Sequence, residues 1–199
     1  MSNIQLIEIP FNVLEAVSLF SAKGRVQQKS RPSLCGIHVT PDYIEACDGV
    51  RALRFEHELS IDVEFLIPII SFLDLRKQLT AKQRRESDVL IRGDLDETGT
   101  LIEMTCNQKV ARFQLEHINF PAIGPLILDP ELYTPSSELC INWRLMNDFQ
   151  KAVRILFFQD SGVIACNDKD ATKPTIVKFD GYDEAIGIIM NIKTASFGV

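Results

Sequence analysis

The sequence lacks the residue patterns that mark enzymes and metal proteins. It holds five cysteines and three histidines, without a C-x-x-C pair and without ligand-type residues at metal-binding spacing. A phosphate-binding loop, a dinucleotide fingerprint and a G-x-S-x-G nucleophile motif are also lacking. We therefore expect no enzyme activity, no catalytic residues, no metal and no cofactor.

Long apolar runs are also lacking. No segment approaches the roughly 18 apolar residues of a membrane span. The first residues, MSNIQLIEIPF, have neither the basic start nor the long apolar stretch of a signal peptide. The odd number of cysteines argues against a disulfide framework, and most lie in strand-like apolar stretches, where a reduced cysteine behaves as a small hydrophobe. These features predict a cytoplasmic protein without a membrane partner.

Positive charge is in deficit, because 21 Lys and Arg stand against 27 Asp and Glu, a net charge of −6. Such a balance would exclude a nucleic acid partner only if the charges were evenly mixed, since a phosphate backbone responds to the local field. The distribution along the chain therefore has to be considered with the predicted elements.

Three segments have the apolar periodicity of helices, at residues 11–23, 70–82 and 143–156. Pro10 before the first and Gly24 after it are suited to a helix start and a helix end. Strand-like runs surround them, at residues 4–9, 34–40, 43–47, 50–57, 64–68, 88–92, 101–106, 110–116 and 139–142, with alternating residues at 185–193. The order strand, helix and three strands therefore recurs three times, which predicts an α+β fold of repeated βαβββ units.

A proline-rich segment divides these units. It covers residues 121–137 and contains Pro121, Pro125, Pro130 and Pro135, a density that disfavours helices and central strands. We expect a surface linker here. Residues 1–120 then form a complete domain of two units, and residues 138–199 form half of another.

Four motifs, in this order along the chain, resemble those of one family, the bacterial DNA sliding clamps (the beta subunit of DNA polymerase III). RPSLCGIHV at 31–39, continued by ACDGVRA at 46–52, is similar to a clamp pattern R-P-x-L-x-G-I followed by a T-D-G-x-R turn. FLIP at 65–68 is similar to the clamp's V-P-A before a lysine-bearing helix, and NFP at 119–121 to the F-P that closes a clamp domain. IIMNIK at 188–193 is similar to the closing I-M-P-M-R-L, with Asn191 in place of a proline.

This resemblance implies a DNA-clamp-like fold, with antiparallel sheets outside and helices on one face, in a chain shorter than a three-domain clamp. It implies sequence-independent contact with the backbone of double-stranded DNA, polymerase or other replication proteins as partners, and a homo-oligomeric ring. If a ring needs about twelve units, four chains of three units would close it. The closing motif assigns Met190 and Ile192 to partner binding.

The basic residues gather on the predicted helices, as a DNA-facing surface requires. The candidate DNA-binding residues are Lys23, Arg25, Arg76, Lys77, Lys82, Arg84, Arg85, Lys151 and Arg154. In the third helix, Lys151 and Arg154 share a face with Asn147, opposite the apolar stripe. Acidic residues instead populate the presumed outer strands and loops, among them Glu56, Glu58, Asp62, Glu64, Asp94, Asp96 and Glu97.

Three alternatives are open at this point. In the first, the basic residues are only the solvated faces of three helices, which is the commoner reason for such charge. In the second, the chain keeps a clamp-like fold but serves as a protein-interaction module that does not encircle DNA. An unrecognised small enzyme is a third, although no motif asks for it.

Overall fold

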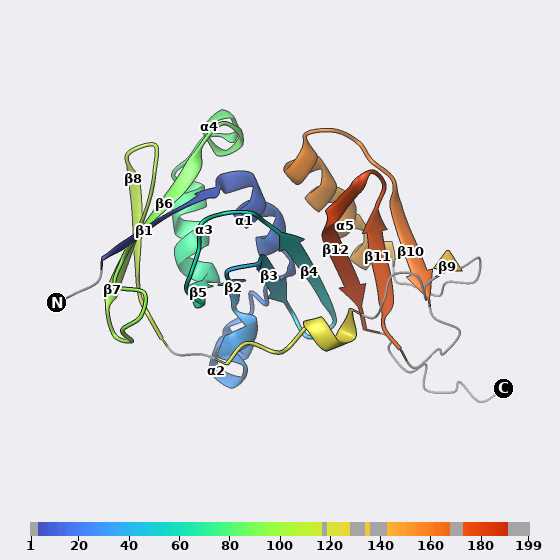
Figure 1. Ribbon diagram of the computed structural model, residues 1–199, viewed down its shortest axis with the longest axis horizontal. Coiled ribbons are helices and arrows are strands. Elements are labelled where there is room, and N and C mark those ends of the chain that lie inside the picture. Colours follow the sequence, from blue (N-terminus) through green and yellow to red (C-terminus); the bar gives the residue numbers. More distant parts are fainter. Residues whose placement is uncertain (1–3, 117–118, 128–133, 136–142, 168–172, 191–199) are drawn as a thin grey trace.

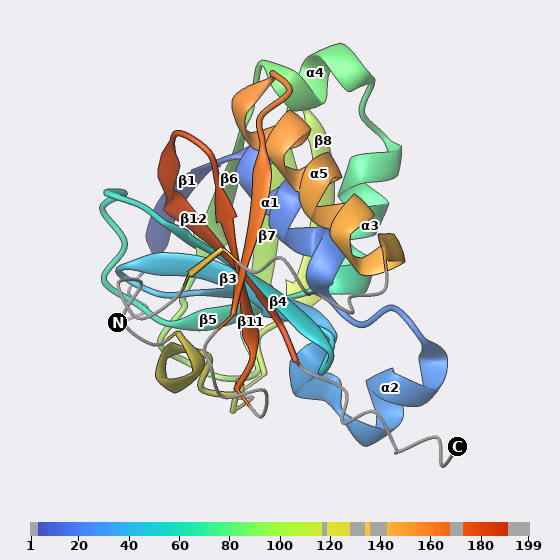
Figure 2. The same ribbon diagram turned by 90° about the vertical axis from the view of Figure 1, so that its right-hand side faces the viewer.

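The computed structural model describes residues 4–116, 119–127, 134–135, 143–167 and 173–190, and it shows two antiparallel sheets with the longer helices gathered on one side of them (Figures 1 and 2). The α+β fold of strand–helix–three-strand units is therefore confirmed. In the part of the chain that is described, no helix is long and apolar enough to cross a membrane.

The elements follow the predicted order. The first unit comprises β1 (Gln5–Pro10), α1 (Phe11–Val17) with a 3₁₀ turn at Ser18–Phe20, α2 (Arg25–Ser30), β2 (Gly36–Val39), β3 (Tyr43–Cys47) and β4 (Arg51–Glu56). The second comprises β5 (Phe65–Pro68), α3 (Ile69–Lys77), α4 (Ala81–Arg85), β6 (Asp88–Gly93), β7 (Leu101–Cys106) and β8 (Lys109–Gln114). The third comprises α5 (Trp143–Phe157), β10 (Val163–Asn167), β11 (Thr175–Phe179) and β12 (Tyr182–Ile189), and the short β9 (Thr134–Pro135) precedes it.

The first two units exchange their opening strands. β1 pairs with β6 of the second unit, so that Ile7 lies opposite Ile91, and β5 pairs with β2 of the first, so that Ile67 lies opposite Ile37. The sheets consequently have the orders β1-β6-β7-β8 and β5-β2-β3-β4-β12-β11-β10-β9. Neither unit can complete its sheet without the other.

The third unit joins the first through β4 and β12, which pair antiparallel with Leu53 opposite Gly187. On the helix side of this junction the rings of Phe20 and Phe149 pack at 4.6 Å between centroids, and both side chains are fully buried. A Cβ built on Gly187 would lie 2.2 Å from the Phe149 ring, so the close approach of α5 to β12 depends on this glycine. One apolar core thus runs through all three units.

A second, smaller apolar cluster covers the other face of the junction. Ala52 of β4, Ile188 of β12 and Ile176 of β11 are buried there under Ile123, which is 2% exposed. Ile123 belongs to the segment predicted as a surface linker, and that expectation is wrong at this residue. Ile123 is buried because its apolar side chain covers the apolar residues where β4 meets β12.

Two predicted helices are shorter than expected. The segment 11–23 is helical only to Phe20, and α2 follows as a separate short helix. The segment 70–82 is broken before Ala81, because Thr80 forms a capping box with Gln83 and begins α4. The strand expected at 139–142 lies outside the described residues. Cysteines 35, 47, 106 and 166 are free thiols.

Candidate nucleic-acid interface

Four arginines from three helices line one surface hollow of about 350 Å³. Arg76 comes from α3, Arg84 and Arg85 come from α4, and Arg154 comes from α5. The sequence predicted all four as candidate DNA-binding residues, and the structure brings them together although 78 positions separate the first from the last. Guanidinium groups grouped in this way are suited to phosphate.

The carboxylate of Glu15 lies at the centre of this arrangement. Glu15 belongs to α1, whose residues are almost all buried, and it is itself 8% exposed. Arg76 Nε donates to Glu15 Oε1 at 2.7 Å, and Arg84 Nη1 donates to the same oxygen. Glu15 therefore anchors two guanidinium groups in the wall of the hollow and cancels part of their charge.

Sequence patterns did not identify Glu15 as a functional residue. A single acid in a short apolar helix is typical of a solvent-facing position, and its two partners lie 61 and 69 residues further along the chain. The unusually apolar surroundings of Glu15 in α1 were the one available signal, since a helix buried on all sides must pair any charge that it carries.

A second charged group lies around Asp148 of α5. Arg51 Nη1 donates to Asp148 Oδ2 at 2.6 Å, and Lys151 Nζ donates to Oδ1 at 2.9 Å. Burial by itself would raise the pKa of Asp148, but the hydrogen bonds from Lys151 and Arg51 outweigh it and hold that pKa below its ordinary value. Arg51 also donates to Asp48 of the Asp-Gly turn, which fixes its direction.

The charges of both groups act on Lys23. Partial desolvation lowers its pKa, Asp148 opposes this effect, and the positive charges of Arg51 and Arg76 add to it. The exposed Lys23 ammonium is therefore within electrostatic range of Arg76 in the hollow and of Asp148 on α5.

The exposed arginines of the hollow, Arg85 and Arg154, differ in the partners of their positive charge. The guanidinium of Arg85 lies 5.1 Å from the centre of the Phe158 ring, and that of Arg154 pairs with Asp160. The predicted face of α5 is confirmed, because Lys151 and Arg154 are exposed opposite the buried stripe. Most of these cations thus have an acidic neighbour, which weakens their field without abolishing it.

Other predicted site residues lie apart from the hollow or cannot be placed. Lys77 pairs with Asp74 within α3 at 3.0 Å, and Lys82 approaches Glu86 within α4 at 4.0 Å. Arg25 begins α2, but its side chain is outside what the structure describes. Ile192 also lies outside the described residues. Met190 is 37% exposed, and its backbone N–H donates to the carbonyl of Val50 across the β4–β12 junction.

The described residues hold no group of three or more His, Cys, Asp or Glu side chains that could bind a metal ion. The arrangement can instead bind phosphate groups by charge, because four guanidinium groups line one hollow. Such contacts position a protein on a duplex but carry no sequence information.

No family model matches the sequence, and no curated protein sequence matches it significantly. Solved structures are similar in fold. A sliding clamp (DNA polymerase III subunit beta) from Bartonella birtlesii, bound to griselimycin, has a TM-score of 0.71 and 13% identity over 96% of this chain and 66% of that chain. The DNA polymerase sliding clamp from Bacillus subtilis has a TM-score of 0.67 and 15% identity over 96% and 64%. The DNA polymerase III beta subunit from Thermotoga maritima has a TM-score of 0.61 and 14% identity over 98% and 67%.

The chain thus spans about two thirds of the length of the solved clamps that it matches, for example 64% of the Bacillus subtilis chain. Nearly all of this chain takes part in the match, in spite of the low identity. The resemblance that the four motifs predicted is therefore confirmed in three dimensions: the chain has the fold of the bacterial DNA polymerase III beta sliding clamps.

Proposed function

We propose that this chain is a non-catalytic, cytoplasmic DNA-tethering or processivity module that holds double-stranded DNA without sequence preference. The observation that carries the proposal is the convergence of Arg76, Arg84, Arg85 and Arg154, from three helices, on one hollow of a sliding-clamp fold. Lys151 adds a further exposed cation on the face of α5 that carries Arg154. Loose attraction between such a surface and phosphate suits a protein that must stay on DNA and still move along it.

The choice of residues for a test follows from Glu15. Removing Arg76 or Arg84 would take away one of the two partners of the buried Glu15 carboxylate and would endanger folding. Arg85 and Arg154 are exposed and can be neutralised with little structural cost. A matched control lies on the outer strand β8, where Arg112 is 58% exposed in its side chain and has one acidic partner, against 60% and one partner for Arg154.

The double variant Arg85→Gln, Arg154→Gln is expected to bind duplex DNA more weakly and with less salt dependence. The slope of log K against log salt should become shallower by about 0.9 for each lost phosphate contact. Titration of labelled duplex at several salt concentrations measures this slope. The control, Lys109→Gln with Arg112→Gln, should leave the slope unchanged.

Retention on nicked circular DNA, compared with linear DNA of equal length, separates encirclement from simple attraction. A tethering ring should slide off linear ends and stay on the circle, and the double variant should shorten that stay. The control variant is compared in the titration only, because it lies on β8, whose edge is proposed below to pair with another chain. Equal changes of the salt slope by the two double variants would contradict the proposed interface. They would favour the alternative, a clamp-fold interaction module, which the acidic partners of most of these cations also support.

We further propose that the chain forms a homo-oligomeric ring. Within the chain, the closing strands of the first and third units pair with each other as β4 and β12. β8 is the closing strand of the second unit and ends its sheet in the order β1-β6-β7-β8, so its outer edge is suited to the same pairing with another chain.

If a ring contains about twelve units, four chains are needed. Native mass spectrometry or light scattering should then give a mass of about 90 kDa for four chains of 22.5 kDa each. Substituting Val110 in β8 by proline, which cannot donate to a ladder, should shift the mass toward smaller species. A monomer at every concentration tested would rule out the ring and leave DNA binding by the single chain to be judged by the titration above.

A further inference from the structure

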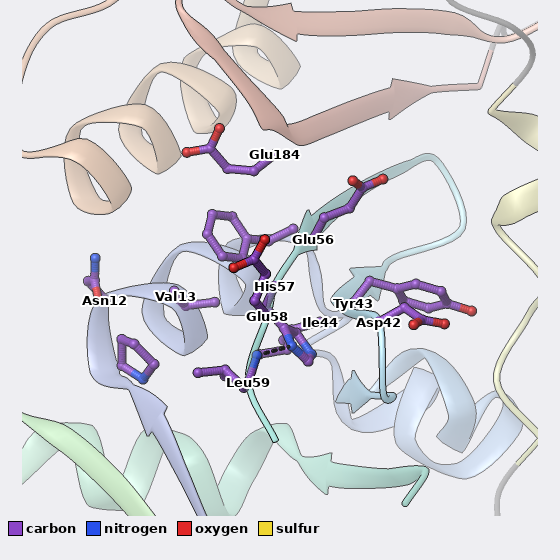
Figure 3. Close-up of a pocket in the computed structure, with 12 residues that line it drawn as sticks. Asn12, Val13, Asp42, Tyr43, Ile44, Glu56, His57, Glu58, Leu59 and Glu184 are labelled. Carbon is purple, nitrogen blue, oxygen red and sulfur yellow. Dashed lines mark hydrogen bonds between the residues drawn. The ribbon is translucent and has the colours of Figure 1, made fainter. Parts of the chain in front are cut away.

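A second and larger hollow carries the opposite charge to the arginine hollow. It has an open volume of about 910 Å³ and lies where α1 begins, beside the end of β4 and the start of β12 (Figure 3). Asn12 lines both hollows, and its side chain donates to the carbonyl of Leu156 at the end of α5. The two surfaces are therefore neighbours separated by the contact of α1 with α5.

The floor of this hollow is apolar. Val13 of α1 and Ile44 of β3 lie at its base and are 5% and 0% exposed, so they are part of the protein core. Phe55 of β4 and Leu59, which follows β4, are half-buried in its wall. Because these last two side chains are only partly covered, a large apolar group placed here would bury additional apolar surface.

The rim is acidic. Asp42 precedes β3, Glu56 and Glu58 lie at and after the end of β4, and Glu184 approaches from β12, as Figure 3 shows. All four side chains are exposed, and within the described residues none of them forms an ion pair. This differs from the arginine hollow, in which the chain supplies its own counter-charges.

His57 does not neutralise this rim. Its Nδ1 accepts the backbone N–H of Leu59 at 3.1 Å, and its Nε2 lies 3.1 Å from the carbonyl of Thr40, to which it donates. This pattern needs a neutral ring. Burial lowers the pKa of His57, against smaller opposing effects of the Thr40 carbonyl and Asp42, so the ring stays uncharged near neutral pH.

We propose that this hollow is a docking site for a basic segment of a partner protein, in which lysine or arginine residues flank one large apolar side chain. The apolar residue would occupy the floor, and the flanking cations would pair with the carboxylates of the rim. A metal ion fits less well, because the described residues hold no group of three carboxylate, thiol or imidazole side chains close enough to share one. Spread carboxylates around an apolar base instead match an extended peptide.

The test uses the whole chain and a synthetic probe, the labelled peptide KRFLRK. A second peptide, KRGGRK, has the same charge but no apolar side chain. Titration by fluorescence anisotropy should show that KRFLRK binds in a salt-dependent manner and at least tenfold more tightly than KRGGRK. Neutralising two rim carboxylates, Glu56→Gln with Glu184→Gln, should weaken KRFLRK binding about three- to tenfold, chiefly by slowing association, because rim charges steer the encounter.

The control removes the same charge outside the hollow. Asp183 adjoins Glu184 in β12 but does not line the hollow, and Glu97 lies between β6 and β7. The variant Asp183→Asn with Glu97→Gln should bind KRFLRK as the unaltered chain does.

Three results would overturn the proposal. Equal weakening by both double variants would reduce the effect to the net charge of the protein. Equal binding of the two peptides would show that the apolar floor is not used. A self-association of the chain that Glu56→Gln with Glu184→Gln abolishes would identify a second copy, rather than a basic partner segment, as the occupant. None of these variants touches the arginines of the DNA titration, so the two proposals can fail separately.

Discussion

The variant Phe149→Ala should lose about 3–5 kcal/mol of unfolding free energy, the cost typical of removing a fully buried aromatic ring. Phe149 of α5 is 0% exposed. The centre of its ring lies 4.6 Å from that of Phe20 in the first unit and 6.3 Å from that of Phe179 in β11 of its own unit. Its removal would therefore leave a cavity between units. Urea unfolding, followed by circular dichroism, measures the loss.

The neighbouring Phe158 provides the control, because it is 48% exposed. Phe158→Ala should cost less than about 1 kcal/mol, mostly through the lost contact with Arg85. Gly187→Ala approaches the same contact from the other side, since its new Cβ would lie 2.2 Å from the Phe149 ring, and it should also be strongly destabilising. If Phe149→Ala cost no more than Phe158→Ala, the shared core between the first and third units would be refuted.

The variant Glu15→Gln should lower stability and raise DNA affinity at the same time. The amide cannot balance the guanidinium groups of Arg76 and Arg84, whose side chains are 40% and 20% exposed, so we expect a loss of about 1–3 kcal/mol of unfolding free energy. The same change removes a negative charge from the hollow. DNA binding should therefore tighten about two- to fivefold, the factor that corresponds to a pair free energy of roughly 0.5–1 kcal/mol.

Glu103→Gln is the matched control for that variant. Glu103 lies on β7, pairs with Arg112 at 2.8 Å and is 38% exposed in its side chain. Both its stability and its DNA affinity should stay within about 0.5 kcal/mol of the unaltered chain. Weaker DNA binding by a folded Glu15→Gln protein would contradict the view that Glu15 shields phosphate from the arginines, and it would make Glu15 a residue that only positions them.

Local sequence patterns predicted the elements well where the local signal was strong. The stripe of Phe149, Ala152, Val153 and Leu156 gave α5 nearly to the residue, and the Asp-Gly turn at 48–49 separates β3 from β4 as expected, with Gly49 at φ +89°. Predictions failed where a local competitor was overlooked. Thr80 and its capping box with Gln83 end one helix and begin another inside what periodicity presented as a single segment.

The sequence predicted the arginines of the candidate site but not the contacts that they make with residues from distant segments. The concentration of arginine on helices gave Arg76, Arg84, Arg85 and Arg154 correctly as members of one surface. Glu15, Arg51 and the acidic hollow were missed as interacting groups, because each depends on partners from distant segments. The division into domains at residues 120 and 137, and the roles assigned to Met190 and Ile192, stay predictions.

The sequence by itself determined the kind and order of the elements, because periods of two and of 3.6 residues state which face of a strand or helix is apolar. It also indicated that many of the basic residues lie on helices. The tertiary structure alone decided that β1 and β5 are exchanged, that β4 meets β12, and that one buried carboxylate restrains two arginines. These are contacts between residues far apart in the chain. They follow from the packing of whole helices and strands, which local sequence patterns do not predict.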